Sequence, residues 1–574
     1  MFTDFLNYIL DMTNIIISVA AISIILLFIY DKWVQRKHSL LINYPVIGRM
    51  RYVFEALREP LRQYFAEESF YDSRDKIDWV YKAAADVPNY MSFSIAQPFS
   101  GSRFIIKHSS HVLNEDEVDE DTSVTFGAKR RIPYVASSPI VRSAMSDGAL
   151  SPEAVRAFTL GGSISNFTLN VGEGGLTSNF FYTHKLTEED KGYMEIVQAE
   201  GWHKTAYSIA DKIFNKAVAA KVHRRLTLKG NPEANTYIFD PSSHSLFRVN
   251  WDAPLENFPK EIPSDMPSLA LQFGSGLYGV RDKDGNFDED RYAKVMKFCH
   301  MTEIKIAQGA KQTGGKLVAE KVTADIAYYR NVPEGENLIS PNRFPYDHTD
   351  GQLFDFIGRL QEISGKPVGF KIVISDADAI DKIVSHIAKR KHEGQSIPDF
   401  ITVDSGEGGS ATAPLEMMES VGLTTNNALY LLDYVLREHQ IRDDIKVIAS
   451  GKILTPDDAI ITLSMGADAI GIARGFMMSG GCIRARMCSG TGSHKCPVGL
   501  ATQDEKKRAS YLVVKQGHKI ASYHKNLVKG IRGMLAIMGV KHVSQLSKKN
   551  LTFKNQNGEI YFDIDKYFQQ KLHI

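Results

Sequence analysis

From about residue 135 onward, short runs of β-branched and aliphatic residues alternate with longer amphipathic patterns of helical spacing. Runs such as 400–404 (FITVD) and 446–450 (KVIAS) are dominated by aliphatic residues instead of alternating between apolar and polar ones. Strands of that kind are buried on both faces, which is typical of parallel sheets whose strands are connected by helices. Eight such runs are present, at 139–145, 166–171, 268–273, 303–308, 368–374, 400–404, 446–450 and 469–473.

Eight strand–helix units of this kind predict an α/β fold, a (β/α)8 TIM barrel at 135–510. A doubly wound open sheet is the alternative topology, because both arrangements use parallel strands joined by helices. The stretch that follows GEGG (172–175) is too long for an ordinary connection to the next strand. We therefore expect an insertion after the second strand, at about 184–262, with helical structure over 188–222.

The N-terminus contains an apolar run at 12–30 that carries no charged residue and is long enough to cross a bilayer. Acidic residues precede this run and basic residues follow it, at Asp4, Asp11, Lys32, Arg36 and Lys37. This asymmetry predicts a single-pass membrane anchor at 1–32, with the catalytic domain facing the cytoplasm. A cleaved signal peptide would carry its positive charge before the apolar run. A buried core helix is the other alternative.

Two segments flank the predicted barrel. The segment 33–134 is predicted to be a juxtamembrane helical region, because Val53, Leu57 and Leu61 recur with helical spacing. The segment 511–574 is predicted to form helices and then a hairpin, in which NQNGE (555–559) supplies the turn.

The amino-acid composition argues against some classes of protein and favours others. Lys and Arg number 68 and Asp and Glu 67, which gives no support for a nucleic-acid-binding surface. The chain has four cysteines, too few for a fold built on disulfides. Three of them lie within 480–504, a concentration that points to metal or redox chemistry.

Glycine-rich segments follow the last three predicted strands, at 405–410 (SGEGGS), 450–452 (SGK) and 473–475 (ARG). Glycine lets backbone N–H groups approach an anion, and phosphate sites of such barrels lie after strands seven and eight. These loops therefore predict a phosphate site to which Arg474 can add charge-assisted hydrogen bonds.

Three further cations are candidates for binding anionic groups. Lys371 lies inside a predicted strand, where an unpaired ammonium would be costly to bury. It either forms an ion pair with a neighbouring strand or stands beside an anionic cofactor such as a flavin. Lys311 and Arg330 could hold a carboxylate substrate, or they could be ordinary salt-bridge residues.

Several motifs together resemble the FMN-binding domain of glutamate synthase, in the order that this family has them. They cover about 135–510 and read MSDGALSPEA, NVGEGG, IKIAQGAKQTGGKL, SGEGGSATAP, ASGKI, GADAIGIARGFM and CPVGLATQD. The juxtamembrane segment NYPVIGRMRYVFEALREPLRQYF (43–65) further resembles a membrane-anchored, single-domain subgroup of glutamate-synthase-like proteins.

The resemblance implies a barrel in which an iron–sulfur cluster passes electrons to FMN. Reduced flavin then gives a hydride to 2-iminoglutarate, which forms from 2-oxoglutarate and ammonia. It implies catalytic roles for Glu173 and Lys311, and substrate contacts at Glu173, Gln308, Lys311 and Arg330. The implied FMN contacts are Met145, Ser146, Gln272, Lys371, Gly408, Gly409, Ser450, Gly451, Ala473 and Arg474.

The chain departs from the family pattern in several places. It begins with MFTDF and not with an amidotransferase domain whose N-terminal cysteine cleaves glutamine, so we expect it to need free ammonia or a partner. The C-terminal β-helix domain of the family is absent as well. The family's GAKPGEGG is GAKQTGG here, and the long insertion after GEGG is atypical.

In the family, three cysteines with the spacing C-x5-C-x4-C hold a [3Fe–4S] cluster. This chain has C-x5-C-x7-C, at Cys482, Cys488 and Cys496. The alternatives are a zinc site with His494 as a fourth ligand and three thiols without a metal.

We therefore expect a membrane-anchored FMN oxidoreductase that reduces a small carboxylated imine or oxo-acid. The electron donor is expected to be a separate protein. One alternative is FMN-dependent oxidation of another small carboxylate such as a 2-hydroxy acid, which would usually require a histidine base. The other is a non-catalytic subunit that binds FMN or an oxo-acid.

Overall fold

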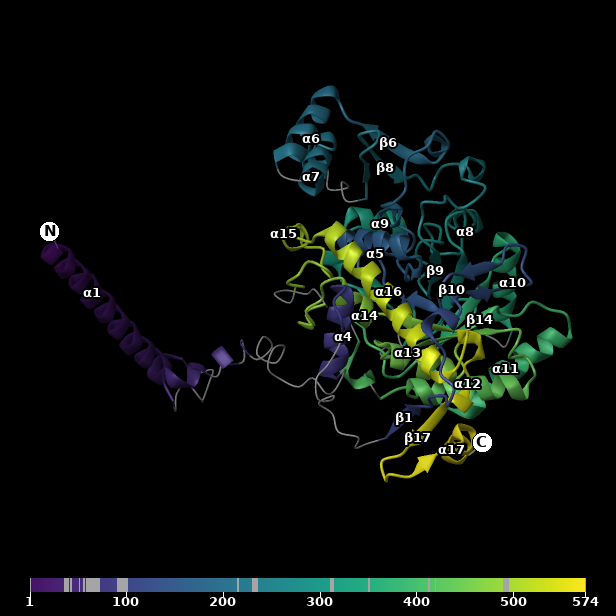
Figure 1. The fold of residues 1–574 in the computed structure, drawn as a ribbon. Helices are drawn as coiled ribbons and strands as arrows, with labels where there is room; N and C mark the ends of the chain where they lie inside the picture. Colours follow the sequence, from purple (N-terminus) through teal and green to yellow (C-terminus); the bar gives the residue numbers. More distant parts are fainter. Residues whose placement is uncertain are drawn as a thin grey trace. The chain divides into compact units, whose positions relative to one another are not determined.

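A closed barrel of eight parallel strands forms the centre of the molecule (Figure 1). The strands follow one another around it in the order β4-β5-β9-β10-β13-β14-β15-β16, and β16 pairs with β4. This confirms the predicted (β/α)8 barrel and excludes the open sheet. The structure is a computed structural model, and it describes residues 2–35, 41, 44–50, 52–54, 57, 73–89, 102–213, 216–229, 236–309, 314–348, 351–410, 413–418, 420–488 and 495–572.

All eight predicted runs are barrel strands. Their bounds are β4 (Ile140–Arg142), β5 (Thr168–Asn170), β9 (Leu269–Phe273), β10 (Met301–Lys305), β13 (Val368–Ile372), β14 (Phe400–Asp404), β15 (Lys446–Ser450) and β16 (Ala469–Ile472). Strand β10 begins two residues and ends three residues earlier than the predicted run 303–308, so Gln308 lies in the loop that follows it. The candidate site residues of that segment are thus on the loop at the carboxyl end of the strand.

Helices follow most of the strands and pack on the outside of the barrel. They are α5 (Pro152–Ser165), α8 (Glu289–Val295), α10 (Gln352–Ser364), α11 (Ala377–His392), α12 (Thr425–Glu438), α13 (Pro456–Ser464) and α14 (Arg474–Ser479). Helix α5 begins where the Ser151 hydroxyl accepts a hydrogen bond from Ala154 N, and it ends at Asn166 in a left-handed conformation.

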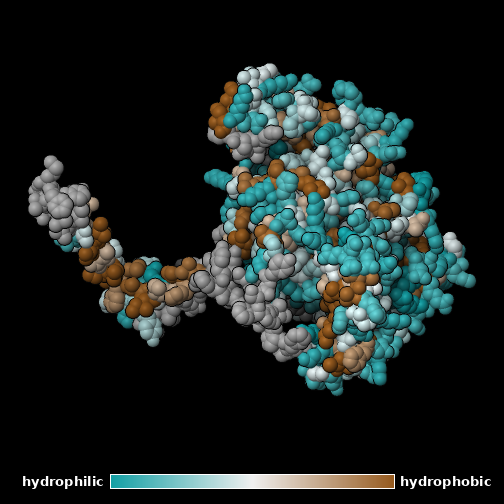
Figure 2. All heavy atoms as spheres, in the orientation of Figure 1, coloured by the Kyte–Doolittle hydropathy of each residue, from teal (hydrophilic) through white to brown (hydrophobic). Residues whose placement is uncertain are grey.

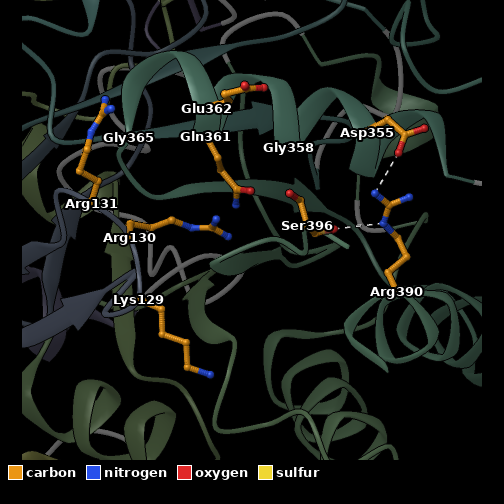
Figure 3. A pocket seen from close by; sticks show the side chains of 10 residues that line it. All are labelled: Lys129, Arg130, Arg131, Asp355, Gly358, Gln361, Glu362, Gly365, Arg390 and Ser396. Atoms are coloured by element: carbon orange, nitrogen blue, oxygen red, sulfur yellow. Dashed lines mark hydrogen bonds and ion pairs between the residues drawn. The ribbon is translucent and has the colours of Figure 1, made fainter. Parts of the chain in front are cut away.

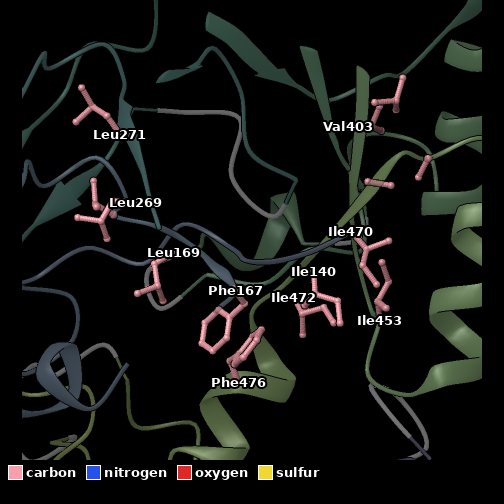
Figure 4. Close-up of a cluster of buried hydrophobic side chains, with 14 of the residues drawn as sticks. Ile140, Phe167, Leu169, Leu269, Leu271, Val403, Ile453, Ile470, Ile472 and Phe476 are labelled. Atoms are coloured by element: carbon pink, nitrogen blue, oxygen red, sulfur yellow. The ribbon is translucent and has the colours of Figure 1, made fainter. Parts of the chain in front are cut away.

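Apolar side chains fill the space between the strands and their helices. Figure 4 shows Ile140, Leu169 and Ile470 from the barrel strands together with Phe167 and Phe476, whose rings are 4.7 Å apart. All five are at most 1% exposed. Burial of this kind supplies most of the free energy that holds helices on a barrel.

A hairpin closes the amino-terminal end of the barrel. It consists of β2 (Val124–Phe126) and β3 (Tyr134–Ala136). Phe126 packs edge-to-face on Phe400, and the Tyr134 hydroxyl is 2.7 Å from Thr168 Oγ1. The functional site is therefore left to the opposite, carboxyl end of the strands.

The long connection after β5 forms a subdomain of mixed structure. Its elements are β6 (Met194–Gln198), α6 (Gly201–Ile213), α7 (Lys216–Thr227), β7 (Ile238–Asp240) and β8 (Ser245–Val249), and the three strands make one sheet. The expected helix over 188–222 is thus interrupted by β6, because Met194 to Gln198 pairs with Ser245 to Val249, a partner that lies far along the chain.

A buried histidine contacts two carboxylates near the two ends of this insertion. The His184 ring lies 2.9 Å from Asp265 through Nδ1 and 3.0 Å from Asp190 through Nε2. Burial lowers the pKa of His184, but the two carboxylates outweigh it and raise the pKa to about 9. Burial raises the pKa of Asp190 and Asp265, and His184 more than reverses that effect.

The C-terminal segment packs against helices from the N-terminal part of the unit that contains the barrel. Helix α16 (Val513–Met538) packs on α5 and on α4 (Arg74–Ala84). The predicted hairpin is present as β17 (Leu551–Lys554) and β18 (Ile560–Tyr561), and α17 (Ile564–Leu572) follows it. Strand β17 also pairs with β1 (Arg103–Ile106).

The described part of the segment 33–134, which was expected to be helical, therefore also contains β1, β2 and the first residue of β3. Each of them gains its hydrogen-bond partner from a hairpin or from the C-terminus, and local spacing does not reveal such partners. Much of the expected helix at 45–65 lies outside the described residues.

Residues 1–69 make up a separate unit. Helix α1 (Phe2–Ile29) runs into a short π-helix at Tyr30–Val34. The span Met12–Val34 is long and apolar enough to cross a membrane, and its most apolar 18-residue window is not buried by protein; a signal sequence can pass the same test. Near its end, Asp31 is fully buried and accepts hydrogen bonds from the Arg49 guanidinium.

The histidine at the base of the insertion predicts a pH-dependent stability. Because the folded pKa of His184 is about 9 and the unfolded value about 6.5, the protonated ring stabilises the fold by roughly 3 kcal/mol below pH 6.5. That contribution is lost as the pH rises through 9. The difference in melting temperature between wild type and His184→Gln should therefore be largest below pH 6.5 and shrink by pH 9.5.

The exposed pair of His439 and Asp381 offers the control, because His439→Gln should change the melting temperature little at any pH. A His184→Gln deficit that is constant from pH 6 to 9.5 would contradict the ion-pair account.

Candidate active site

A carboxylate on a loop and a lysine at the end of a strand form the centre of the site. Glu173 lies in the loop after β5, and its Oε1 is 2.9 Å from Nζ of Lys305, the last residue of β10. Burial raises the pKa of Glu173, but Lys305, Arg330 and Lys371 together bring it below the ordinary value. The Glu173 carboxylate is therefore held ionised at neutral pH.

A second pair lies on the next two strands. Lys371 Nζ of β13 is 3.7 Å from Asp404 Oδ2 of β14. The same Asp404 oxygen accepts a hydrogen bond from Gly309 N at 3.1 Å. Lys371 is thus paired with a neighbouring strand, as one of the two sequence interpretations expected, and Asp404 holds the loop after β10 in place.

Inside the barrel, the carboxylate of Glu303 accepts hydrogen bonds from several strands. It is 3% exposed and accepts hydrogen bonds from Asn170 Nδ2 at 2.8 Å, from Gln272 and from Thr402. Gln272, a predicted cofactor contact, therefore has its amide NH2 directed to the barrel interior. Hydrogen bonds from three strands explain how a carboxylate can be accommodated there.

Arg330 reaches the site from outside the barrel sheet. It is the last residue of α9 (Ala324–Arg330), it is 4% exposed, and its guanidinium stacks over the Tyr278 ring at 5.2 Å. Arg330 Nη2 donates to the Asp147 carbonyl at 3.3 Å, whereas Nε has no partner among the described residues. Burial lowers the pKa of this guanidinium, and Glu173 opposes that effect.

The loops after β4 and β5 touch, which joins the predicted FMN residues Met145 and Ser146 to Glu173. Gly172 makes this possible, because its φ is +74° and a Cβ there would come within 2.6 Å of Ser146 N. At Gly174, a Cβ would lie 2.9 Å from the guanidinium of Arg330.

The three glycine-rich loops meet at the same end of the barrel. A Cβ on Gly451 would lie 2.2 Å from Ser405 Oγ, and Ser450 Oγ is 3.4 Å from Ser143 Oγ. Gly408 N closes a turn on the Ser405 carbonyl. Among the described residues, the one atom near a Cβ built on Gly409 would be Nη2 of Arg474, at 3.9 Å.

These loops leave polar groups available to a ligand. Ser405 is fully buried, and its hydroxyl has no partner among the described residues. Arg474 begins α14, and Ala473 is the N-cap of that helix without a side-chain hydrogen bond. A hydroxyl, an arginine and small residues in one place are suited to a phosphate or another anion.

The structure leaves part of the candidate set undescribed. Lys311 lies outside the described residues. Gln308 is half-buried in the loop after β10. Sequence reasoning missed Lys305, Glu303 and Asp404, and the signal that could have found them is a charged residue inside a run of otherwise apolar strand residues.

The three cysteines lie on the segment that follows α14. Cys496 is buried, and Cys482 and Cys488 are half-buried. Burial, with smaller contributions from the other two thiols, raises the pKa of the Cys482 thiol to about 11. Within the described residues no group of three His, Cys, Asp or Glu side chains could hold a metal, and 489–494, which includes His494, lies outside them.

A hollow of about 640 Å³ lies apart from this site and includes none of the predicted residues (Figure 3). Two of its arginines are already paired, Arg130 with Asp399 at 2.7 Å and Arg390 with Asp355 at 2.9 Å. Paired cations offer little to a ligand, so we assign it no function.

The site is thus a carboxylate, two lysines and a buried arginine beside loops suited to an anion, at the carboxyl end of a (β/α)8 barrel, where enzymes of this fold have their active sites. The family model for the conserved region in glutamate synthase matches residues 76–541. The chain belongs to the glutamate synthase family.

Two relatives show how far the similarity extends. The glutamate synthase large subunit-like protein YerD of Bacillus subtilis is 29% identical over 579 residues, which cover 97% of each chain. The archaeal glutamate synthase (NADPH) of Methanocaldococcus jannaschii is 31% identical over 294 residues, which cover 50% of this chain and 53% of the relative. The chain therefore spans only about half of that relative.

Among solved structures, a variant flavocytochrome b2 with sulfite bound is 12% identical. It covers 87% of this chain and 85% of its own, with a TM-score of 0.40. A similarity of this size adds nothing to the assignment of function.

The contact between Glu173 and Lys305 can be tested by a double-mutant cycle. Lys305→Met leaves a largely buried carboxylate without its nearest cation, so it should lower the free energy of unfolding by about 2–4 kcal/mol. Adding Glu173→Gln should restore part of that loss. Denaturant unfolding of the four proteins gives the coupling energy.

The exposed pair of Arg359 and Glu289 is the matched control, with an expected coupling below about 1 kcal/mol. Additive effects of Lys305→Met and Glu173→Gln would contradict the contact.

Proposed function

We propose that this protein is an FMN-dependent oxidoreductase that reduces the imine of 2-oxoglutarate or of a related oxo-acid. The observation that carries the proposal is the ionised Glu173 between Lys305 and Arg330, beside three loops suited to a phosphate. Membership of the glutamate synthase family supports this reaction class.

The residues at the carboxyl end of the barrel fit FMN. The unpartnered Ser405 hydroxyl, the open space at Gly409 and the adjacent Arg474 would hold the phosphate, and Lys371 would lie near the flavin ring. When bound, FMN would supply hydride transfer to the substrate. Of the predicted FMN contacts, Gln272 would act indirectly, through its hydrogen bond to Glu303 inside the barrel.

The substrate's carboxylate would bind at Arg330. This guanidinium is nearly fully buried, close to Glu173, and has a free Nε among the described contacts. A carboxylate that accepts two hydrogen bonds from it would offset the burial of its charge. Lys311 and Gln308 would contribute further contacts to the same substrate.

Glu173 would act on the nitrogen side of the substrate. Its pKa is lowered, so the carboxylate is ionised and can accept a hydrogen bond from an ammonium ion or an iminium N–H. Lys305 Nζ fixes the position of this carboxylate from the end of β10. Together they would orient the imine carbon and exclude water from one side of it.

The proposal also includes a membrane location and a separate electron donor. The span Met12–Val34 would anchor the chain in a membrane, and Lys32, Arg36 and Lys37 would keep the barrel on the cytoplasmic side. A separate protein would then deliver electrons.

The substrate role of Arg330 can be tested by kinetics. With 2-oxoglutarate, ammonium and a chemical reductant as electron source, Arg330→Ala should raise KM for 2-oxoglutarate about 10- to 100-fold, because a charge-assisted hydrogen bond is lost. Bound FMN should stay at wild-type level. Arg281→Ala is the control, since Arg281 lies over the same Tyr278 ring at 5.9 Å.

No turnover of 2-oxoglutarate by an FMN-loaded wild type, with any reductant, would rule out this substrate. An unchanged KM in Arg330→Ala would remove Arg330 from the site.

The [3Fe–4S] cluster stays a prediction from the family resemblance, and no step above depends on it. The three half-buried or buried thiols lie on one segment, but the described residues do not bring them together as a group that could hold a metal. Anaerobically purified protein should contain about three iron atoms per chain. Cys482→Ser should lose them and retain FMN, whereas FMN-loaded wild type without iron would contradict the cluster.

A further inference from the structure

Helix α6 of the insertion carries an apolar stripe on its solvent-exposed face. The side chains of this stripe are Trp202, Ile209 and Ile213, which are 57%, 52% and 66% exposed. With Ala206 they recur at intervals of three or four residues and so share one face of the helix.

This stripe does not serve the packing of the insertion itself. A different face of α6 is already buried in the insertion, through His203, Tyr207 and Ala210. In addition, Trp202 Nε1 is 3.3 Å from Glu200 Oε2, and its ring stacks edge-on against His203 at 4.0 Å. The indole is therefore held in place while its surface remains open to solvent.

The same helical hairpin is strongly basic, although the chain as a whole is balanced. Between residues 201 and 229 the one acidic residue is Asp211, and the seven basic ones are Lys204, Lys212, Lys216, Lys221, Arg224, Arg225 and Lys229. Lys204, Lys212, Arg225 and Lys229 are exposed. Figure 2 shows hydrophobic surface beside hydrophilic surface at the place that α6 occupies in Figure 1.

We propose that α6 docks on an anionic lipid surface, with Trp202, Ile209 and Ile213 inserted between the headgroups and the surrounding lysines and arginines near the phosphates. A helix with a tryptophan-containing apolar stripe and basic flanks is typical of elements that lie in a membrane interface. Each basic residue near such a surface contributes about 1 kcal/mol.

Attachment of the same chain through α1, which is itself proposed above, favours lipid over an acidic protein as the occupant. A surface to which the chain is tethered is present at high effective concentration, so even a weak second contact is occupied. The barrel would then be held to the membrane at two points, the N-terminal helix and the insertion.

The test uses the full chain in lipid nanodiscs and the fluorescence of Trp202. This signal is the difference between wild type and Trp202→Phe, measured with phospholipids brominated in the upper acyl chain as quenchers. In discs with about 30 mol% phosphatidylglycerol we expect Trp202 to be quenched, and in phosphatidylcholine discs much less. Lys212→Gln should lower the ratio of docked to undocked protein about fivefold.

Ile209→Asn combined with Ile213→Asn should abolish the quenching, whereas Ser208→Asn, an exposed neighbour outside the stripe, should leave it unchanged. Absence of quenching in anionic discs would overturn the proposal and leave the stripe to a protein partner. Equal quenching in both kinds of disc would overturn the role of the anionic headgroups. A chain that does not enter the discs would contradict both this contact and the anchor.

Discussion

The functional end of this protein depends on the pairing of the last barrel strand with the first. Ile470 N donates to the Pro139 carbonyl at 2.7 Å, and Ser143 N donates to the Ile472 carbonyl at 3.0 Å. These bonds close the sheet, so the loops after β16 and β4 become neighbours although more than half the chain separates them. Without closure, Arg474 and the segment after β4 would lie at opposite edges of an open sheet.

The sequence sufficed for the barrel because parallel strands buried on both faces read as short aliphatic runs, here repeated eight times between amphipathic helical patterns. The sequence did not predict strand β1, strand β6 or the hairpin of β2 and β3. Those strands are short and mixed in composition, and they exist because a partner elsewhere in the chain supplies their hydrogen bonds. Local spacing carries no information about such partners.

For the candidate site, the glycine-rich loops could be predicted because they are distinctive and stand at strand ends, whereas Arg330 was implied by the family resemblance. The charged residues that pair with or support the site could not be predicted. Lys305 and Glu173 are separated by 132 residues, and only the register of the closed barrel brings them to 2.9 Å. Likewise, Glu303 could be seen in the sequence as a charged strand residue, but its hydrogen bonds to three other strands depend on side chains that point inward together.

The pairing of β1 with β17 has a consequence for how the molecule can be divided. The match to the family model ends at residue 541, whereas β17 begins at Leu551 and covers the edge of Arg103–Ile106. A fragment cut at the end of that match would keep β1 but expose its backbone N–H and C=O groups, a template for association between copies. The end of the family model is therefore not a position at which this chain can be safely shortened.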